Sequence, residues 1–196
     1  MIAHDTISKT FTILAIIIIL YLSTFSLSLE LLFPSILLIS GIITQLYESQ
    51  KIEYVDSVFE EETSYNILFY TLIALAGIGI STFFSPIVLS VKPIAFEIRY
   101  TGFQLMLFGV LMAIAEEQFF RGFITNFLLK FSSIIAILGS AGIFAVYHLA
   151  VYGTKPEAII YVFIGGMILA YVAIRSQRLS PTMIAHSIVN ILATVR

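Results

Sequence analysis

The sequence predicts an all-α membrane protein: a polytopic helical bundle of about seven transmembrane helices (six to eight). Of the 196 residues, 59% are hydrophobic and only 11% are charged, whereas a soluble domain carries about 25% charged residues. Apolar runs of roughly 17–25 residues, the length that crosses a bilayer, also follow one another along the chain. So few charges cannot cover the surface of a soluble domain of this size.

The charge balance and the missing cysteines narrow the class further. The chain has 10 basic and 12 acidic residues, a net charge of −2 and no cysteine. Soluble globular enzymes, disordered chains and nucleic-acid partners are therefore excluded, as are a disulfide framework and thiolate metal sites. We expect a multi-pass integral protein of the cell membrane, whose partners are the lipid bilayer and a membrane-associated substrate.

The apolar runs define the order of the elements. The predicted spans are 10–29, 31–47, 65–91, 102–129, 133–153, 156–174 and 180–196. Transmembrane strands are excluded because these runs lack the alternation of a barrel, and open sheet edges are not tolerated in lipid. We divide the chain into N-terminal membrane helices, residues 1–100, and a helical core, residues 101–196.

The boundaries between the spans carry local signals. The connector 48–64 has six acidic residues and one lysine, which indicates a solvated segment, with a docking surface for a basic substrate as the alternative. Thr154-Lys-Pro-Glu157 predicts a capping box with Thr154 as the N-cap, and Ser180-Pro181 predicts the start of the last helix. Gly165 and Gly166 are typical of close helix packing.

Three charged residues lie inside a predicted span: Glu116, Glu117 and Arg121. Each costs roughly 2.5–3.5 kcal/mol at the centre of a membrane helix, so all three need partners. Glu117 and Arg121 are four residues apart and share a helix face, whereas Glu116 is rotated by about 100° from Glu117. The spacing predicts a Glu117–Arg121 ion pair and leaves Glu116 for other chemistry. A buried ion-pair cluster that only stabilises packing is the alternative.

Two histidines and an asparagine lie in the spans that follow. His148 ends the motif Phe144-Ala-Val-Tyr-His148, and His186 and Asn190 share a face of the last helix because they are four residues apart. We count depth at 1.5 Å per residue from the membrane side that carries Lys130 and Arg178. On this count Glu116, His148 and Asn190 lie about 20, 22 and 15 Å deep, and His186 lies near 9 Å. These depths fit one site if the last helix starts deeper or tilts.

Such a set of side chains can activate water beside a peptide carbonyl. A buried glutamate can act as the general base and a histidine can share the proton, while an imidazole and a carboxamide can donate to an oxyanion. Zinc is the alternative cofactor, with Glu116, His148 and His186 as its ligands. The absence of an HExxH motif and the weakness of asparagine as a zinc ligand favour glutamate-type water activation.

Together these motifs resemble the CPBP family of intramembrane endopeptidases, which includes the type II CAAX prenyl proteases and proteins of bacteriocin processing and self-immunity. Its signature of EExxxR, FxxxH and HxxxN stands here within residues 102–196. The resemblance implies a helical bundle around a polar intramembrane cavity, and hydrolysis of a peptide bond in a membrane-associated or prenylated substrate. It also implies that Glu116 activates water with the help of His148, that His186 and Asn190 line the oxyanion side, and that Glu117 and Arg121 support the site.

Two other functional classes fit the same polar cluster. A non-catalytic immunity or scaffold protein could retain it for stability or partner binding. A proton-coupled carrier could use it as a relay, since glutamate and histidine chains carry protons in transporters. The sequence has no internal repeat, which counts against a transporter built from inverted repeats.

Overall fold

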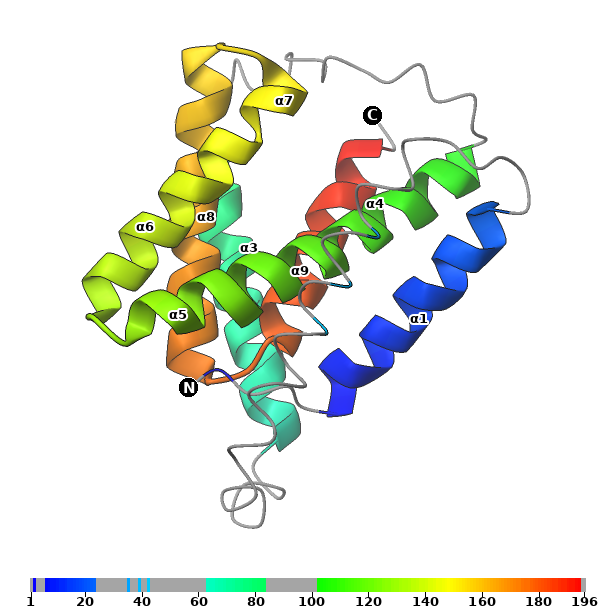
Figure 1. Ribbon diagram of the computed structural model, residues 1–196, viewed down its shortest axis with the longest axis horizontal. Coiled ribbons are helices and arrows are strands. Elements are labelled where there is room, and N and C mark those ends of the chain that lie inside the picture. The colour runs from blue at the N-terminus through cyan, green and yellow to red at the C-terminus, as the bar shows by residue number, and fades with distance from the viewer. Residues whose placement is uncertain are drawn as a thin grey trace.

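A computed structural model of the chain describes Ile2, residues 6–23, 35, 39 and 42, residues 63–83 and residues 102–194. The elements of this part of the chain are helices (Figure 1), which confirms the predicted all-α class for these residues. The predicted span 31–47 and the acidic connector 48–64 lie almost wholly outside the described residues. The seven-helix count and the polar cavity therefore stay predictions.

Two helices come from the N-terminal half. Helix α1 covers Thr6–Ser23 and α3 covers Thr63–Phe83. Helix α1 begins before the predicted start at residue 10, and its first turns hold buried hydroxyl groups. The Thr12 hydroxyl donates to the carbonyl oxygen of Ser8 at 3.0 Å, a bond within the helix that lets a polar side chain be buried without a tertiary partner.

The central helix runs without a break over the 28 residues Gly102–Leu129, as predicted, but its middle is not α-helical. Helix α4 (Gly102–Glu116) leads into a π-helix, η2 (Glu117–Thr125), which continues into α5 (Asn126–Leu129). The Thr125 hydroxyl donates to the carbonyl oxygen of Phe120, five residues back, at 2.8 Å. Stretches of π-helix are rare in proteins, and those that occur are often at functional sites. This one begins inside the Glu116–Arg121 motif.

The predicted span 133–153 is divided into two helices. Helix α6 covers Ser133–Tyr147 and the short α7 covers Leu149–Tyr152, with His148 in the turn between them. His148 is the C-cap of α6, and its backbone ψ of −5° departs from the α-helical value, which ends α6 at this residue. Gly153 follows with a φ of 63°, which closes the turn before the next helix.

Helix α8 covers Pro156–Ser176 and α9 covers Ser180–Thr194, close to the predicted bounds. The predicted capping box is wrong: the N-cap of α8 is Lys155, and no side chain caps it. Because Pro156 stands at the first helical position, the residue before it is held in the extended region, and this moves the N-cap from Thr154 to Lys155.

The C-terminal helices pack as antiparallel pairs around the central helix. Helix α6 lies against α8, α4 lies against α9 and α1, and α3 contacts both α8 and α9 (Figure 1). Gly166 permits the close contact of α8 with α6, because a Cβ atom there would lie 3.2 Å from the Cα atom of Ala141. A Cβ atom at Gly109 would lie 3.4 Å from the Cβ atom of Asn190, so α4 and α9 are also close at this level.

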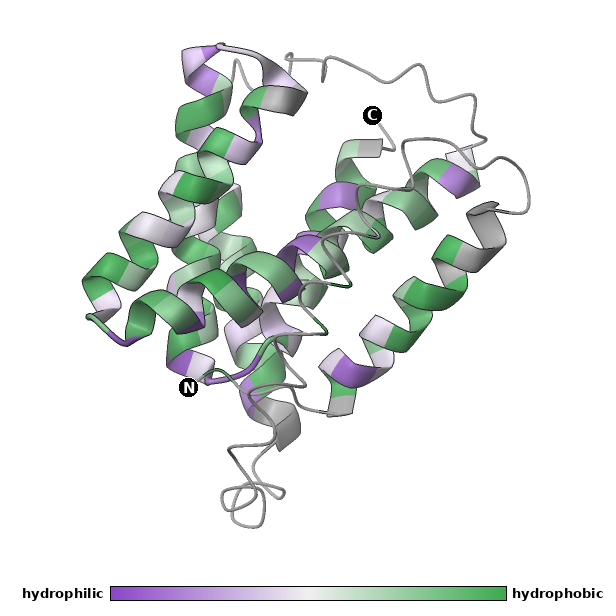
Figure 2. Ribbon diagram, viewed as in Figure 1, coloured by the Kyte–Doolittle hydropathy of each residue, from purple (hydrophilic) through white to green (hydrophobic). Residues whose placement is uncertain are grey.

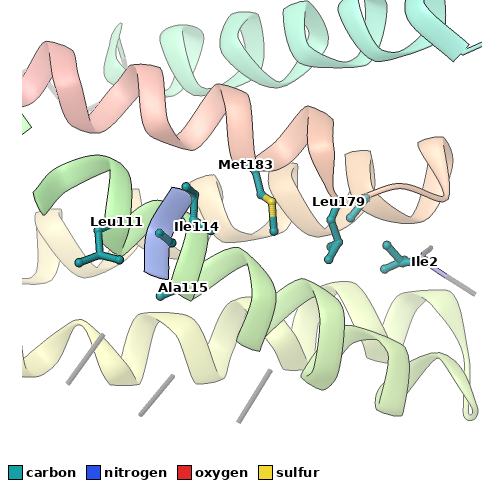
Figure 3. Packing of buried hydrophobic residues seen from close by; sticks show 8 residues of the cluster. Ile2, Leu111, Ile114, Ala115, Leu179 and Met183 are labelled. Atoms are coloured by element: carbon teal, nitrogen blue, oxygen red, sulfur yellow. The ribbon is translucent and has the colours of Figure 1, made fainter. Parts of the chain in front are cut away.

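An apolar cluster holds α1, α4 and the start of α9 together next to the polar motif. Figure 3 shows Ile2, Leu111, Ile114, Ala115, Leu179 and Met183 in this cluster. Ile114 and Ala115 directly precede Glu116 and are buried. The cluster therefore fixes the end of α4, from which the first glutamate projects.

The outside of the bundle is apolar. Figure 2 shows that α1, α4 and α6 consist largely of hydrophobic residues, and the side chains of Phe131, Ile134 and Val146 are 66%, 70% and 65% exposed. Two helices of the described part, Gly102–Leu129 and Pro156–Ser176, are long and apolar enough to cross a membrane. Lipid is the natural solvent for such a surface.

The two adjacent glycines of α8 provide a test of the packing. We expect Gly166→Ala to lower the thermal unfolding temperature in detergent, because the added methyl group must displace Ala141 at a cost of about 1–3 kcal/mol. Gly165→Ala is the matched control, since a Cβ atom there meets nothing within 4 Å. Equal unfolding temperatures for the two variants would contradict the close contact of α6 and α8.

Candidate active site

The predicted ion pair between Glu117 and Arg121 is present. Nη1 of Arg121 lies 2.9 Å from Oε1 of Glu117, and both side chains are fully buried. The guanidinium of Arg121 also donates through Nη2 to the carbonyl oxygen of Gly166 at 3.3 Å and lies 4.5 Å from the centre of the Phe144 ring. One side chain of η2 thus reaches α8 through a backbone carbonyl and α6 through an aromatic face.

Glu116 has two partners from other helices. The hydroxyl of Tyr147, at the end of α6, donates to its Oε1 atom at 3.2 Å. Its Oε2 atom lies 3.5 Å from Nε2 of His186 on α9. Glu116 as a whole residue is 5% exposed. The glutamate that the helical spacing left unpaired is therefore held between α6 and α9.

His186 bridges the two glutamates. Its Nδ1 atom lies 2.8 Å from Oε1 of Glu117, and its Nε2 atom faces Oε2 of Glu116. An ionised carboxylate can only accept, so Nδ1 carries a proton that it donates to Glu117. The depth count had placed His186 much closer to the surface than Glu116. The sequence allowed the two residues to meet if the last helix tilts, and α4 and α9 run obliquely to α8 (Figure 1), so residue counts do not measure depth.

His148 lies in the turn between α6 and α7, with its ring among aromatic neighbours. Its Nδ1 atom is 2.9 Å from the carbonyl oxygen of Phe144, and since a carbonyl can only accept, Nδ1 is the donor. In the neutral ring Nε2 is then left as a proton acceptor. The ring centre lies 4.3 Å from that of Phe144 and 5.9 Å from that of Tyr152, with which it stacks.

Asn190 ties α9 to α4. Its Nδ2 atom donates to the carbonyl oxygen of Gly109 at 3.0 Å, at the level where the glycine lets the two helices approach. A carboxamide nitrogen carries two hydrogens, so one remains for another acceptor. Asn190 is half-buried, one turn from His186.

The structure brings two further residues to the site that were not predicted. Tyr147 contacts Glu116, and its only sequence signal is its place directly before His148 within the FxxxH motif. Thr182 donates its hydroxyl to the carbonyl oxygen of Leu179 at 2.9 Å and also lies beside the Glu117 carboxylate. Thr182 stands four residues before His186, so the helical spacing that joins His186 to Asn190 also points to it.

The predicted zinc ligands do not converge. In the part of the chain that the structure describes, no group of three His, Cys, Asp or Glu side chains is arranged to hold a metal ion. Glu116 and His186 are neighbours, whereas within the described residues no hydrogen bond or ion pair joins His148 to either of them. These residues do not fit a zinc site, and no step below is assigned to a metal.

The segment that carries this geometry also matches a known family. Residues 99–192 match the family model described as type II CAAX prenyl endopeptidase, Rce1-like. This part of the chain is similar to the Rce1-like family. The match contains all three motifs, from Glu116 to Asn190, and confirms the predicted family. Neither the curated proteins nor the solved structures contain a match to the chain. The Rce1-like family consists of membrane-embedded proteases.

The buried arginine of this family motif provides a test of the site's architecture. We expect Arg121→Ala to lower the yield of folded protein in size-exclusion chromatography, because it removes the guanidinium that is paired with the buried Glu117 carboxylate, at a cost of about 3–5 kcal/mol. Arg175→Ala removes an exposed arginine of α8 and is the matched control. The same folded yield and unfolding temperature for both variants would show that the buried pair does not stabilise the fold.

Proposed function

We propose that this protein is an intramembrane endopeptidase that hydrolyses a peptide bond in a prenylated CAAX-like or other membrane-associated substrate. Glu116 activates the attacking water. One observation carries the proposal: within the segment that matches the Rce1-like family, His186 bridges Glu116 and Glu117, with Arg121 behind Glu117. This arrangement supplies a buried base that has a partner for its proton.

The charge balance of the cluster supports Glu116 as that base. The charges of Arg121 and Glu117 cancel each other, and uncompensated charge in apolar surroundings is strongly unfavourable. Glu116 and His186 are therefore neutral as a pair and hold one proton between them. The proton is on His186 when Glu116 is ionised and on Glu116 when the imidazole is neutral. An ionised glutamate beside an imidazolium is the form that can accept a proton from water.

The hydrolysis then proceeds in two steps. Glu116 takes a proton from water while the water oxygen bonds to the carbonyl carbon of the substrate, which places a negative charge on the carbonyl oxygen. The protonated Glu116 then delivers this proton to the amide nitrogen as the carbon–nitrogen bond breaks, and a carboxylic acid and an amine are released. The same residue is base and then acid, as microscopic reversibility allows.

The remaining side chains have roles that follow from their contacts. His186 is the proton partner of Glu116, because both of its ring nitrogens face glutamates. This differs from the oxyanion role that the family resemblance implies for it. The second hydrogen of the Asn190 carboxamide is available to the oxyanion. His148 supplies a second proton acceptor through Nε2, while Glu117 and Arg121 hold His186 in place.

The proposal predicts that Glu116→Gln abolishes cleavage and leaves the fold intact. The carboxamide oxygen can still accept from Tyr147, but it cannot take a proton from water, so the rate of cleavage should fall at least about a hundredfold. The assay is release of the C-terminal tripeptide from a farnesylated CAAX peptide in liposomes, with the unprenylated peptide alongside.

The control for this variant is Glu157→Gln, which makes the same change at an exposed glutamate in the first turn of α8. It should cleave at the wild-type rate. Wild-type activity in Glu116→Gln would overturn the mechanism. Equal cleavage of the farnesylated and the unprenylated peptide would be consistent with the mechanism, but it would show that the enzyme does not recognise the prenyl group.

A further inference from the structure

Tyr147 is the one described side chain from α6 that donates to the proposed catalytic base. It is the last residue of α6, and its hydroxyl donates to Oε1 of Glu116 at 3.2 Å. Nothing in the three family motifs specifies this residue, since it occupies a variable position of FxxxH. Its contact with Glu116 spans 31 residues of sequence and joins α6 to the end of α4.

The ring of Tyr147 is held by aromatic neighbours from two helices. Its centre lies 5.3 Å from that of Phe120 on η2 and 6.4 Å from that of Phe144, against which it is stacked. The ring of His148 lies 5.0 Å away, edge to face. Packing of this kind restricts the ring and so aims the hydroxyl at Glu116.

The two oxygens of the Glu116 carboxylate are consequently different. Oε1 accepts from Tyr147, and Oε2 faces Nε2 of His186. An oxygen that accepts from a phenol is the less favourable one for a proton of its own, so the proton that Glu116 exchanges resides on Oε2. That oxygen is the one that shares a proton with His186.

We propose that Tyr147 is a positioning residue that fixes the Glu116 carboxylate through Oε1 and directs the exchanged proton to Oε2, between Glu116 and His186. The inference rests on the proposed function, because it assigns a role in the reaction that Glu116 initiates. Tyr147 acts through Glu116 and need not touch the substrate.

The test is Tyr147→Phe, which removes the hydroxyl and keeps the ring packing. Loss of a hydrogen bond to a charged group should lower kcat by about tenfold to a hundredfold. KM for the farnesylated CAAX peptide should stay within about twofold of the wild-type value. The acid limb of the kcat profile should move to higher pH, because the ionised carboxylate has lost a donor. The charged and titratable groups that also face Glu116 are unchanged in this variant: His186, His148, Arg121 and Tyr152.

The matched control is Tyr171→Phe, which removes a hydroxyl from a tyrosine that is 49% exposed on α8. It should leave kcat and the pH profile at wild-type values. Wild-type kcat and an unmoved acid limb in Tyr147→Phe would overturn the inference. A residue that only packs would instead lower the unfolding temperature and the amount of active enzyme without moving the pH profile.

A second substitution covers the case in which Tyr147→Phe does not fold. Replacing Tyr147 by fluorotyrosine keeps the shape of the ring and makes the hydroxyl a stronger donor, so the acid limb should move to lower pH. An unmoved limb would overturn the inference. Glu116→Gln in the same assay separates the two proposals: its inactivity with an unaffected Tyr147→Phe refutes the positioning role alone, whereas its full activity refutes the proposed function itself.

Discussion

The buried ion pair between Glu117 and Arg121 is the interaction on which the rest of the site depends. Two full charges without exposure to solvent are tolerated in apolar surroundings only when they are paired and hydrogen-bonded. Here the pair also organises its neighbours: Arg121 contacts α8 through Gly166 and α6 through Phe144, and Glu117 receives His186 from α9. Three helices are thus oriented by two side chains one turn apart.

The π-helical turn has a direct effect on this arrangement. Glu116 is the last residue of α4 and Glu117 the first of η2, so the change in helix type falls between the two glutamates. Both still reach the same imidazole, Glu117 through Nδ1 and Glu116 through Nε2. The two nitrogens of one ring therefore couple the carboxylate that is paired with Arg121 to a carboxylate that can exchange a proton, which is the property that a water-activating glutamate needs.

The sequence was sufficient for features that depend on local spacing. Glu117 and Arg121 pair because residues four apart share a helix face, and the apolar runs after residue 101 became helices with nearly the predicted bounds. Features that depend on how helices cross were not predictable: the depth of His186, the contact of Tyr147 with Glu116 and the turn at His148. The N-cap of α8 was missed because the constraint of Pro156 on Lys155 outweighs the capping signal of Thr154.

The protonation of His186 is the most direct measure of the central claim, that this ring shares one proton with Glu116 while it donates to Glu117. Nitrogen NMR of histidine-labelled protein, with His186 assigned by substitution, reports the state of each ring nitrogen. The account predicts an Nδ1 that stays protonated across the pH range in which the protein is folded, and an Nε2 signal that shifts in Glu116→Gln. An Nε2 signal unaffected by Glu116→Gln, or an unprotonated Nδ1, would contradict it.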